Sequence, residues 1–232
     1  MKKERSLCTI NIDDIVKEIK IPEGPIIVAI FNHHKELMSK YDVIERKNGY
    51  YVPDPPYSLE NTKVQQRIKD MFWRSTEELA EAVETIPIEF KLAGWVECWD
   101  TEPNVRHFFE ELSDALHFLT EASILAKLNP VRIAFSNLLD SNARFRAFSS
   151  STVISRITDI IFNMGFAANT LKNKPWKLTQ VSTDVAKFKD QLVDVWASFT
   201  DLWNYLKCNQ EQVYIFYAKK NLVNQWRQKT NY

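Results

Sequence analysis

The chain has 232 residues, of which 45% are hydrophobic, and its 30 lysines and arginines balance its 30 aspartates and glutamates. This length is sufficient for one well-buried core, so we expect a single domain over residues 1–232. The balanced charge excludes a general attraction to nucleic acid or to an anionic membrane, and any recognition of phosphate must therefore be local.

The cysteines and the hydropathy pattern favour a cytoplasmic protein. Cys8, Cys98 and Cys208 are odd in number, widely separated and without the close spacing of a zinc site, which is typical of a reducing compartment. The longest apolar run, residues 25–31, is far too short to span a membrane, and the residues after Met1 are polar rather than those of a secretion signal. We expect neither a membrane nor a nucleic acid as a partner.

Apolar residues recur at intervals of three or four over most of the chain, and only four glycines occur, which predicts an all-α fold, a helical bundle. A first helix is expected from residue 25 to about 41, followed by a loop over residues 47–56 that is rich in turn formers. The second helix should lie within residues 59–86, because Pro87 ends it. The third should run from Pro103 to the Asn-Pro pair at 129–130.

Further helical segments are expected near residues 131–139, 152–171 and 183–206, with a last helix from about 210 to 228. The serines at 149–151 and Thr152 resemble a turn with an N-cap rather than a linker between domains. No internal repeat of fixed period is evident.

Two of the expected helices each carry a pair of carboxylates at a spacing of three. Glu78 and Glu81 form one pair, and Glu111 and Asp114 form the other. Residues three apart lie on one helical face, with their Cβ atoms roughly 5–6 Å from each other. If the two helices pack side by side, four carboxylates converge and repel one another unless cations neutralise them. Ligands that are all oxygen favour Mg²⁺ or Mn²⁺, and such ions usually complete their shell with water and substrate phosphates, so the pattern predicts a nucleotide site.

The last helix presents cations and an amide on one face. Lys220, Asn224 and Arg227 follow one another at steps of four and three. Such a face can meet a triphosphate, with Arg227 as a fork for oxygens and with Asn221 or Asn224 reaching a sugar hydroxyl. An exposed polar helix face has the same pattern, so this interpretation stays open here.

Three motifs together resemble the dimeric all-α dUTPase and dCTPase family, a branch of the all-α nucleoside triphosphate pyrophosphatases that includes bacteriophage enzymes. The family's Glu-x-x-Glu is similar to Glu78–Glu81, and its Glu-x-x-Asp is similar to Glu111–Asp114. Its C-terminal Lys-Asn-x-x-Asn-x-x-Arg-Gln is similar to residues 220–228, followed more loosely by Tyr232. The resemblance covers residues 64–128 and the last twenty, so residues 131–210 are expected to be an elaboration of this chain.

The resemblance implies a homodimer, encoded by a phage and acting in the host cytoplasm, that hydrolyses dUTP and/or dCTP to the monophosphate and pyrophosphate. It implies that Mg²⁺, or alternatively Mn²⁺, is held by Glu78, Glu81, Glu111 and Asp114. Glu78 would orient or deprotonate the attacking water, and Lys220 and Arg227 would stabilise charge on the leaving pyrophosphate. Asn221 and Asn224 would contact phosphate or sugar.

One departure from the family leaves the base open. The uracil enzymes use a glutamine on the first helix, but this chain has Asn32, His33 and His34 in the corresponding stretch. Asn32 or His34 is expected to take over the contact with the base. A neutral imidazole offers a donor or an acceptor according to its tautomer, so either a uracil or a cytosine edge is compatible.

Several alternatives accompany this interpretation. His117 follows Asp114 by three, but a di-iron centre needs two Glu-x-x-His motifs, so it is disfavoured. His107 has no identifiable partner in the sequence. The aromatic residues near the acidic helices are expected in the core or at an interface rather than against a base: Phe72, Trp73, Trp95 and Trp99. The competing function is a catalytically inactive helical bundle that binds nucleotides or another protein.

Overall fold

The computed structural model describes residues 19–86, 103–133, 149–173, 178 and 181–230. These residues form six α-helices and one short 3-10 helix: α2 (Ile26–Lys47), α3 (Thr62–Glu84), α5 (Pro103–Leu125), η1 (Pro130–Arg132), α6 (Ser150–Thr170), α7 (Val185–Tyr205) and α8 (Gln210–Thr230). No strand occurs among them, which confirms the all-α prediction. Within the described ranges, none of the helices combines the length and apolarity needed to cross a bilayer.

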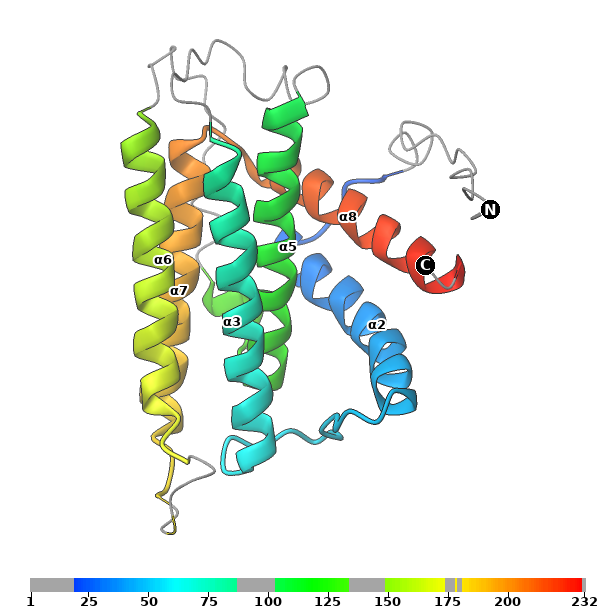
Figure 1. The fold of residues 1–232 in the computed structure, drawn as a ribbon, viewed down its shortest axis with the longest axis vertical. Coiled ribbons are helices and arrows are strands. Elements are labelled where there is room, and N and C mark those ends of the chain that lie inside the picture. The colour runs from blue at the N-terminus through cyan, green and yellow to red at the C-terminus, as the bar shows by residue number, and fades with distance from the viewer. Residues whose placement is uncertain (1–18, 87–102, 134–148, 174–177, 179–180, 231–232) are drawn as a thin grey trace, which may run out of the picture.

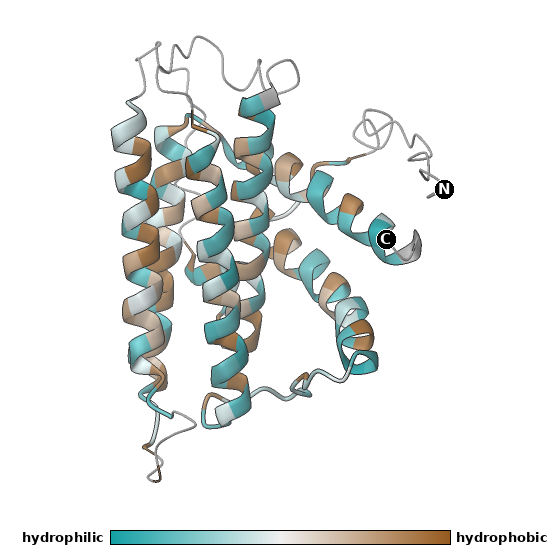
Figure 2. Cartoon of the chain, viewed as in Figure 1, coloured by the Kyte–Doolittle hydropathy of each residue, from teal (hydrophilic) through white to brown (hydrophobic). Residues whose placement is uncertain are grey.

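The helices form an upright group with two oblique helices beside it (Figure 1). The closest pairings join α3 to α5 and α6 to α7, while α2 and α8 pack against each other and against α5. Teal and brown residues alternate along each helix in Figure 2, as expected for helices with one apolar face. Because α5 contacts α2, α3 and α8, its side chains are the ones that reach several elements at once.

Local signals fix where α3 begins and which face it buries. The side chain of Asn61 accepts a hydrogen bond from the backbone N–H of Lys63 at 2.8 Å, which caps the helix. The buried residues then recur at helical spacing: Val64, Ile68, Met71, Phe72, Ser75, Leu79 and Ala82. Apolar side chains on this stripe pack toward α5, so the acidic residues beside the stripe must lie at the edge of the α3–α5 interface.

The first helix is longer than the sequence predicts. It ends at Lys47 rather than near residue 41, and Gly49, with φ of +85°, follows its end. In its last turns Val43 is 67% exposed and Ile44 is 38% exposed, so no apolar stripe marks this part of the helix. Of the segment expected near residues 131–139, the described part contains only η1, and residues 134–139 lie outside the described ranges.

The expectation that the aromatic residues of α3 lie in the core or at an interface is confirmed for Phe72, which is in the core, and stays a prediction for the exposed Trp73, where only an interface is left. Phe72 is 4% exposed, whereas Trp73 is 62% exposed and donates from its indole N–H to Glu77 at 2.9 Å. Consecutive helical residues point about 100° apart, so only one of the two can face α5. Trp95 and Trp99 lie outside the described residues.

An aromatic stack joins three helices at the centre of the core. The ring of Phe109 on α5 stacks on Phe216 of α8 with centroids 4.7 Å apart and on Trp203 of α7 at 5.9 Å. All three side chains are buried. The stack thereby fixes α8, which carries Lys220 and Arg227, against α5.

We expect the Phe109→Ala variant to lose about 3–5 kcal/mol of unfolding free energy, because it removes a buried aromatic ring and leaves a cavity between three helices. Urea unfolding followed by far-ultraviolet circular dichroism measures this loss. The matched control is Phe166→Ala on α6, where the ring is 60% exposed and the change should stay within about 0.5 kcal/mol. Equal losses in the two variants would contradict the central role of the stack.

Candidate functional site: a carboxylate cluster beside a cavity

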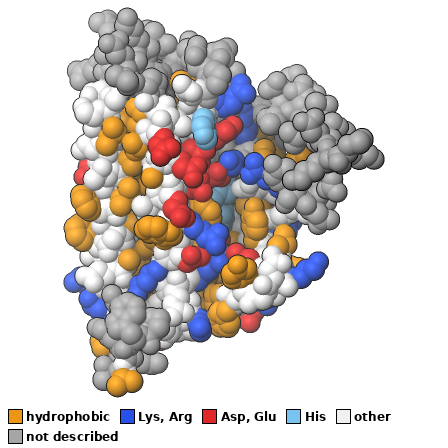
Figure 3. Space-filling view, in the orientation of Figure 1, with side chains coloured by type: hydrophobic (Ala, Val, Ile, Leu, Met, Phe, Trp, Pro, Cys, Tyr) orange, Lys and Arg blue, Asp and Glu red, His pale blue; other side chains and the backbone are white. Residues whose placement is uncertain are grey.

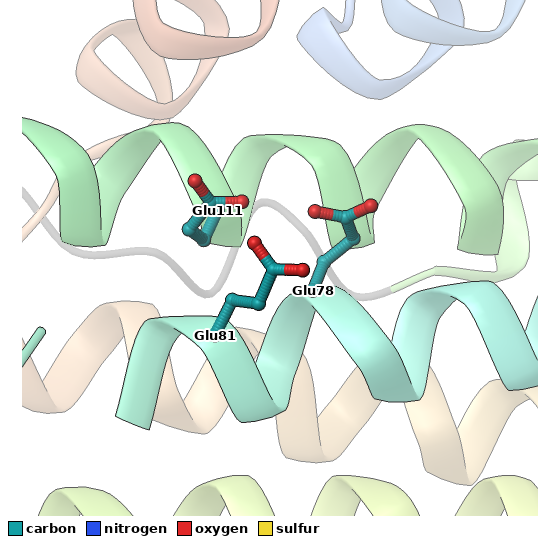
Figure 4. A group of neighbouring side chains, drawn as sticks. All are labelled: Glu78, Glu81 and Glu111. Carbon is teal, nitrogen blue, oxygen red and sulfur yellow. The ribbon is translucent and has the colours of Figure 1, made fainter. Parts of the chain in front are cut away.

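The packing of α3 against α5 brings three of the four predicted carboxylates together. Ligand oxygens of Glu78, Glu81 and Glu111 all lie within 4.8 Å of one another. Figure 4 shows Glu78 and Glu81 reaching from α3 toward Glu111 on α5. Glu111 is buried, Glu78 is partly exposed and Glu81 is exposed, so the cluster is anchored in the protein and open at one side. A group of three oxygens at this spacing can hold a metal ion.

Asp114, the fourth predicted ligand, lies beside this cluster and has another partner. Its carboxylate forms an ion pair with Lys220 of α8 at 2.5 Å, and both side chains are largely buried, at 17% and 15% exposed. Its charge nevertheless acts on the cluster, since Asp114 helps to raise the pKa of Glu78. The structure therefore places Asp114 at the border of the cluster, where Lys220 neutralises it.

The cluster holds more negative charge than its surroundings compensate. Burial, a hydrogen bond with Glu111 and the charges of the neighbouring carboxylates raise the pKa of Glu78 to about 8. Burial also raises the pKa of Asp114 to about 6, although Lys220 and Arg227 oppose this shift. Carboxyl groups that keep a proton near neutral pH are typical of sites where a cation or a proton balances converging carboxylates.

A histidine that the sequence leaves without a partner contacts the cluster from outside. His107 Nδ1 lies 2.7 Å from Glu111 Oε1, one helical turn away on α5. The spacing of four between His107 and Glu111 could have predicted this contact, because residues four apart share a helical face.

A cavity of about 150 Å³ opens next to Asp114 between α2, α3, α5 and α8. The polar side chains that line it include His34, Tyr41, Arg67, His117, Glu121 and Asn224, with Leu37, Met71 and Phe118 as apolar walls. On the molecular surface, acidic side chains gather in the middle of one face, and basic and histidine side chains lie next to them (Figure 3). The cavity and the cluster therefore form one continuous region that has Asp114 at the boundary.

Arg67 organises the charged wall of the cavity. Its guanidinium contacts Glu121 of α5 at 2.9 Å and Glu45 of α2 at 2.9 Å, so it connects three helices. Burial by itself raises the pKa of Glu121, but contacts with His34 and Arg67 outweigh burial and lower it. Direct contact with Arg67 thus favours the charged form of Glu121, whereas burial and the neighbouring carboxylates favour the protonated form of Glu78.

The tautomer of His117 follows from its contacts. Its Nδ1 lies 2.7 Å from the backbone oxygen of Ser113, and a carbonyl oxygen can only accept, so Nδ1 carries the proton. Burial and the neighbouring His34 lower the pKa of His117 to about 3, which keeps the ring neutral. Nε2 is then a bare acceptor, and it is buried with no hydrogen-bond partner in the part of the chain that the structure describes. His117 is one of the residues that line the cavity, so the cavity lining includes a residue with a buried acceptor that lacks a partner among the described residues.

His34 lies where the sequence places it, at the cavity, and its surroundings are more crowded than expected. Its Nδ1 contacts the hydroxyl of Tyr217 at 3.2 Å, and its Nε2 lies 3.8 Å from Glu121. Asn32 is exposed on α2 and is not among the residues that line the cavity. Of the two residues expected to replace the family's glutamine, only His34 lines the cavity, and its contact with a base stays a prediction.

The predicted residues of α8 fall into different environments. Asn224 lines the cavity, and the exposed Arg227 is close enough to lower the pKa of Asp114. Asn221 is only 3% exposed; it donates to the Tyr217 hydroxyl at 3.4 Å and accepts from Gln225 at 2.7 Å. The structure thus places Asn221 in a buried hydrogen-bond network behind the cavity instead of on the cavity wall.

Arg67, Glu121 and Tyr217 were not predicted from the sequence. The spacing could have indicated Glu121, because it follows Glu111 by ten residues and Asp114 by seven, which places it near the same helical face. No local spacing could have indicated Arg67, since its partners Glu45 and Glu121 are 22 and 54 positions away in the chain.

Comparison with known proteins gives one match. A family model described as dUTPase matches residues 61–232, which include α3, α5 and α8 as well as residues 131–210. No curated protein and no solved structure matches the chain.

We expect Glu78→Gln to stabilise the metal-free protein increasingly as the pH rises. The pKa of Glu78 is about 8 in the folded state and near 4.5 in the unfolded chain, so between these values the folded state retains a proton that the unfolded chain releases. Stability of the wild type therefore falls with rising pH over this window, and the variant lacks this loss. Because the side chain is partly exposed, the gain at pH 8 should be about 1 kcal/mol.

Thermal melts in EDTA at pH 4.5 and at pH 8 measure the effect. The control is Glu84→Gln, an exposed glutamate at the end of the same helix that is not a member of the cluster. A stability difference between Glu78→Gln and the wild type that is the same at both pH values would contradict the mutual repulsion of the clustered carboxylates.

Proposed function

Because this chain belongs to the all-α dUTPase family, we propose that it hydrolyses a pyrimidine deoxyribonucleoside triphosphate, dUTP and/or dCTP, to the monophosphate and pyrophosphate with Mg²⁺ as cofactor. The observation that carries the proposal is the continuity of the carboxylate cluster with a cavity whose lining includes a residue with a buried acceptor that lacks a partner among the described residues. A triphosphate is anionic at one end and offers hydrogen-bond donors at the other, which matches these two neighbouring environments.

The residues of the cluster fit a hard divalent cation. Their donor set consists of oxygen alone, the ligand oxygens lie within 4.8 Å of one another, and burial together with the neighbouring carboxylates raises the pKa of Glu78. Glu78, Glu81 and Glu111 would hold Mg²⁺ or Mn²⁺, with Asp114 as the predicted fourth ligand. Bound there, the ion supplies charge neutralisation at the phosphates and lowers the pKa of the attacking water.

The chain's own groups account for proton transfer and leaving-group stabilisation. With a cation in the cluster favouring its ionised form, Glu78 would orient the attacking water or accept a proton from it. Lys220 lies at the border of the cluster through its pair with Asp114, and Arg227 is on the same side. These two cations stabilise the charge that develops on the departing pyrophosphate.

The cavity takes the nucleoside. His117 Nε2 accepts a hydrogen bond from the ligand, and both the ring N–H of uracil and the amino group of cytosine can donate it. His34 and Asn224 supply further polar contacts from α2 and α8. A base with a donor on its edge is favoured because it gives His117 Nε2 a hydrogen-bond partner, and a buried acceptor without a partner costs about 1–3 kcal/mol.

We further propose that the chain acts as a homodimer, as the resemblance of its three motifs implies. Analytical ultracentrifugation tests this assembly, and a monomer at the concentrations used for catalysis would contradict it.

Product analysis tests the proposed reaction. The purified chain is incubated with Mg²⁺ and separately with dUTP, dCTP, dTTP, dATP and dGTP, with EDTA as the control. We expect monophosphate plus pyrophosphate from dUTP, dCTP or both, and no product in EDTA. Release of inorganic phosphate in place of pyrophosphate would contradict cleavage between the α- and β-phosphates, and turnover of no substrate would favour the inactive bundle.

Replacing Glu111 with Gln should lower hydrolysis by more than about a hundredfold, because an amide provides a weaker ligand at the buried centre of the cluster. Helix content by circular dichroism should not change. Glu110→Gln is the matched control, since this neighbour lies outside the cluster, and its activity should stay near the wild-type value. Full activity of the Glu111 variant would contradict the assignment.

A further inference from the structure

The contact between His107 and Glu111 has no evident purpose in folding. His107 Nδ1 lies 2.7 Å from Glu111 Oε1, and the histidine side chain is 53% exposed whereas the glutamate is 8% exposed. A side-chain pair one helical turn apart stabilises an isolated helix by only about 0.2–0.5 kcal/mol. This pair, however, ends on a carboxylate that belongs to the cluster of three.

We propose that His107 is a positioning residue that orients the Glu111 carboxylate for metal binding. The proposal rests on the proposed metal site. In either protonation state the imidazole can donate from Nδ1, so one oxygen of Glu111 accepts from His107 while the carboxylate keeps lone pairs for an ion. Groups that hydrogen-bond a metal ligand from outside fix its rotamer and tune its affinity, and their loss typically costs about 10–100-fold in metal binding.

The electrostatics of the cluster make this orientation necessary. Glu111 lies among Glu78, Glu81 and Asp114, and repulsion favours turning its flexible side chain away from them. Lys220 is paired with Asp114, so its charge is already engaged at the other side. A donor fixed on the same helix opposes this movement at little entropic cost, because the helix holds residues 107 and 111 at a constant separation.

The geometry distinguishes positioning from direct ligation. The cluster whose ligand atoms lie within 4.8 Å of one another consists of Glu78, Glu81 and Glu111, and His107 is not a member of it. Its contact atom is Nδ1, the ring nitrogen nearer the backbone. An asparagine amide nitrogen occupies nearly the same place as Nδ1 but provides nothing in the place of Nε2, so asparagine separates the two roles.

Titration of the nucleotide-free full chain with Mn²⁺ at one fixed pH, followed by electron paramagnetic resonance of the free ion, tests the proposal. We expect His107→Ala to weaken Mn²⁺ binding by at least about tenfold, and His107→Asn to stay within about threefold of the wild type. The matched control is Trp73→Phe, which removes an exposed donor four residues before Glu77, a glutamate outside the cluster. It should leave Mn²⁺ binding unchanged, and all variants should melt at the wild-type temperature within a few degrees.

The possible results separate this inference from the function on which it rests. Equal Mn²⁺ affinity in His107→Ala and the wild type would overturn the positioning role while leaving the metal site intact. Weak binding in both His107→Ala and His107→Asn would overturn positioning in favour of direct ligation. No Mn²⁺ binding by the wild type would overturn the metal site and the positioning role together.

Discussion

The packing of α3 against α5 forces like charges together, and the rest of the site depends on this constraint. The buried stripes of the two helices meet in the core, and Glu78 and Glu111 lie directly beside these stripes. Separating the carboxylates would require exposing apolar surface at about 25 cal/mol per Å², so the core maintains a repulsion that exposed side chains would relieve. The raised pKa of Glu78 is the result.

Two counter-charges are paired with carboxylates at the border of the cluster. Lys220 neutralises Asp114 at one side, and Arg67 neutralises Glu121 and Glu45 at another wall of the cavity. Because these two cations are engaged with peripheral carboxylates, a cation from solution or a proton can balance the central ones. This distribution explains why the pKa of the buried Glu121 falls while that of the partly exposed Glu78 rises within the same region.

Besides its charged wall around Arg67, the cavity next to the cluster is lined by neutral polar groups. Burial keeps His117 uncharged, and a backbone carbonyl fixes its tautomer, so the ring offers an acceptor with a fixed direction. Behind it, Tyr217 stacks on His117 with ring centroids 4.2 Å apart and contacts His34. Asn221 completes this network, which gives the amide a supporting role that the last helix's sequence pattern did not indicate.

The sequence by itself determined the helices and the two carboxylate pairs, because both depend on separations of three or four residues, whereas the packing of α3 against α5 brought the pairs together. The repeat of apolar positions placed α3 and α5, and the spacing of Glu78 with Glu81 put two carboxylates on one face; the His107–Glu111 contact has the same local origin. Only the tertiary structure decided that Lys220 pairs with Asp114 and that Arg67 connects α2 to α5. Those contacts join segments that are distant in the chain, and their geometry depends on how whole helices pack. The spacing of residues along one helix does not predict that packing.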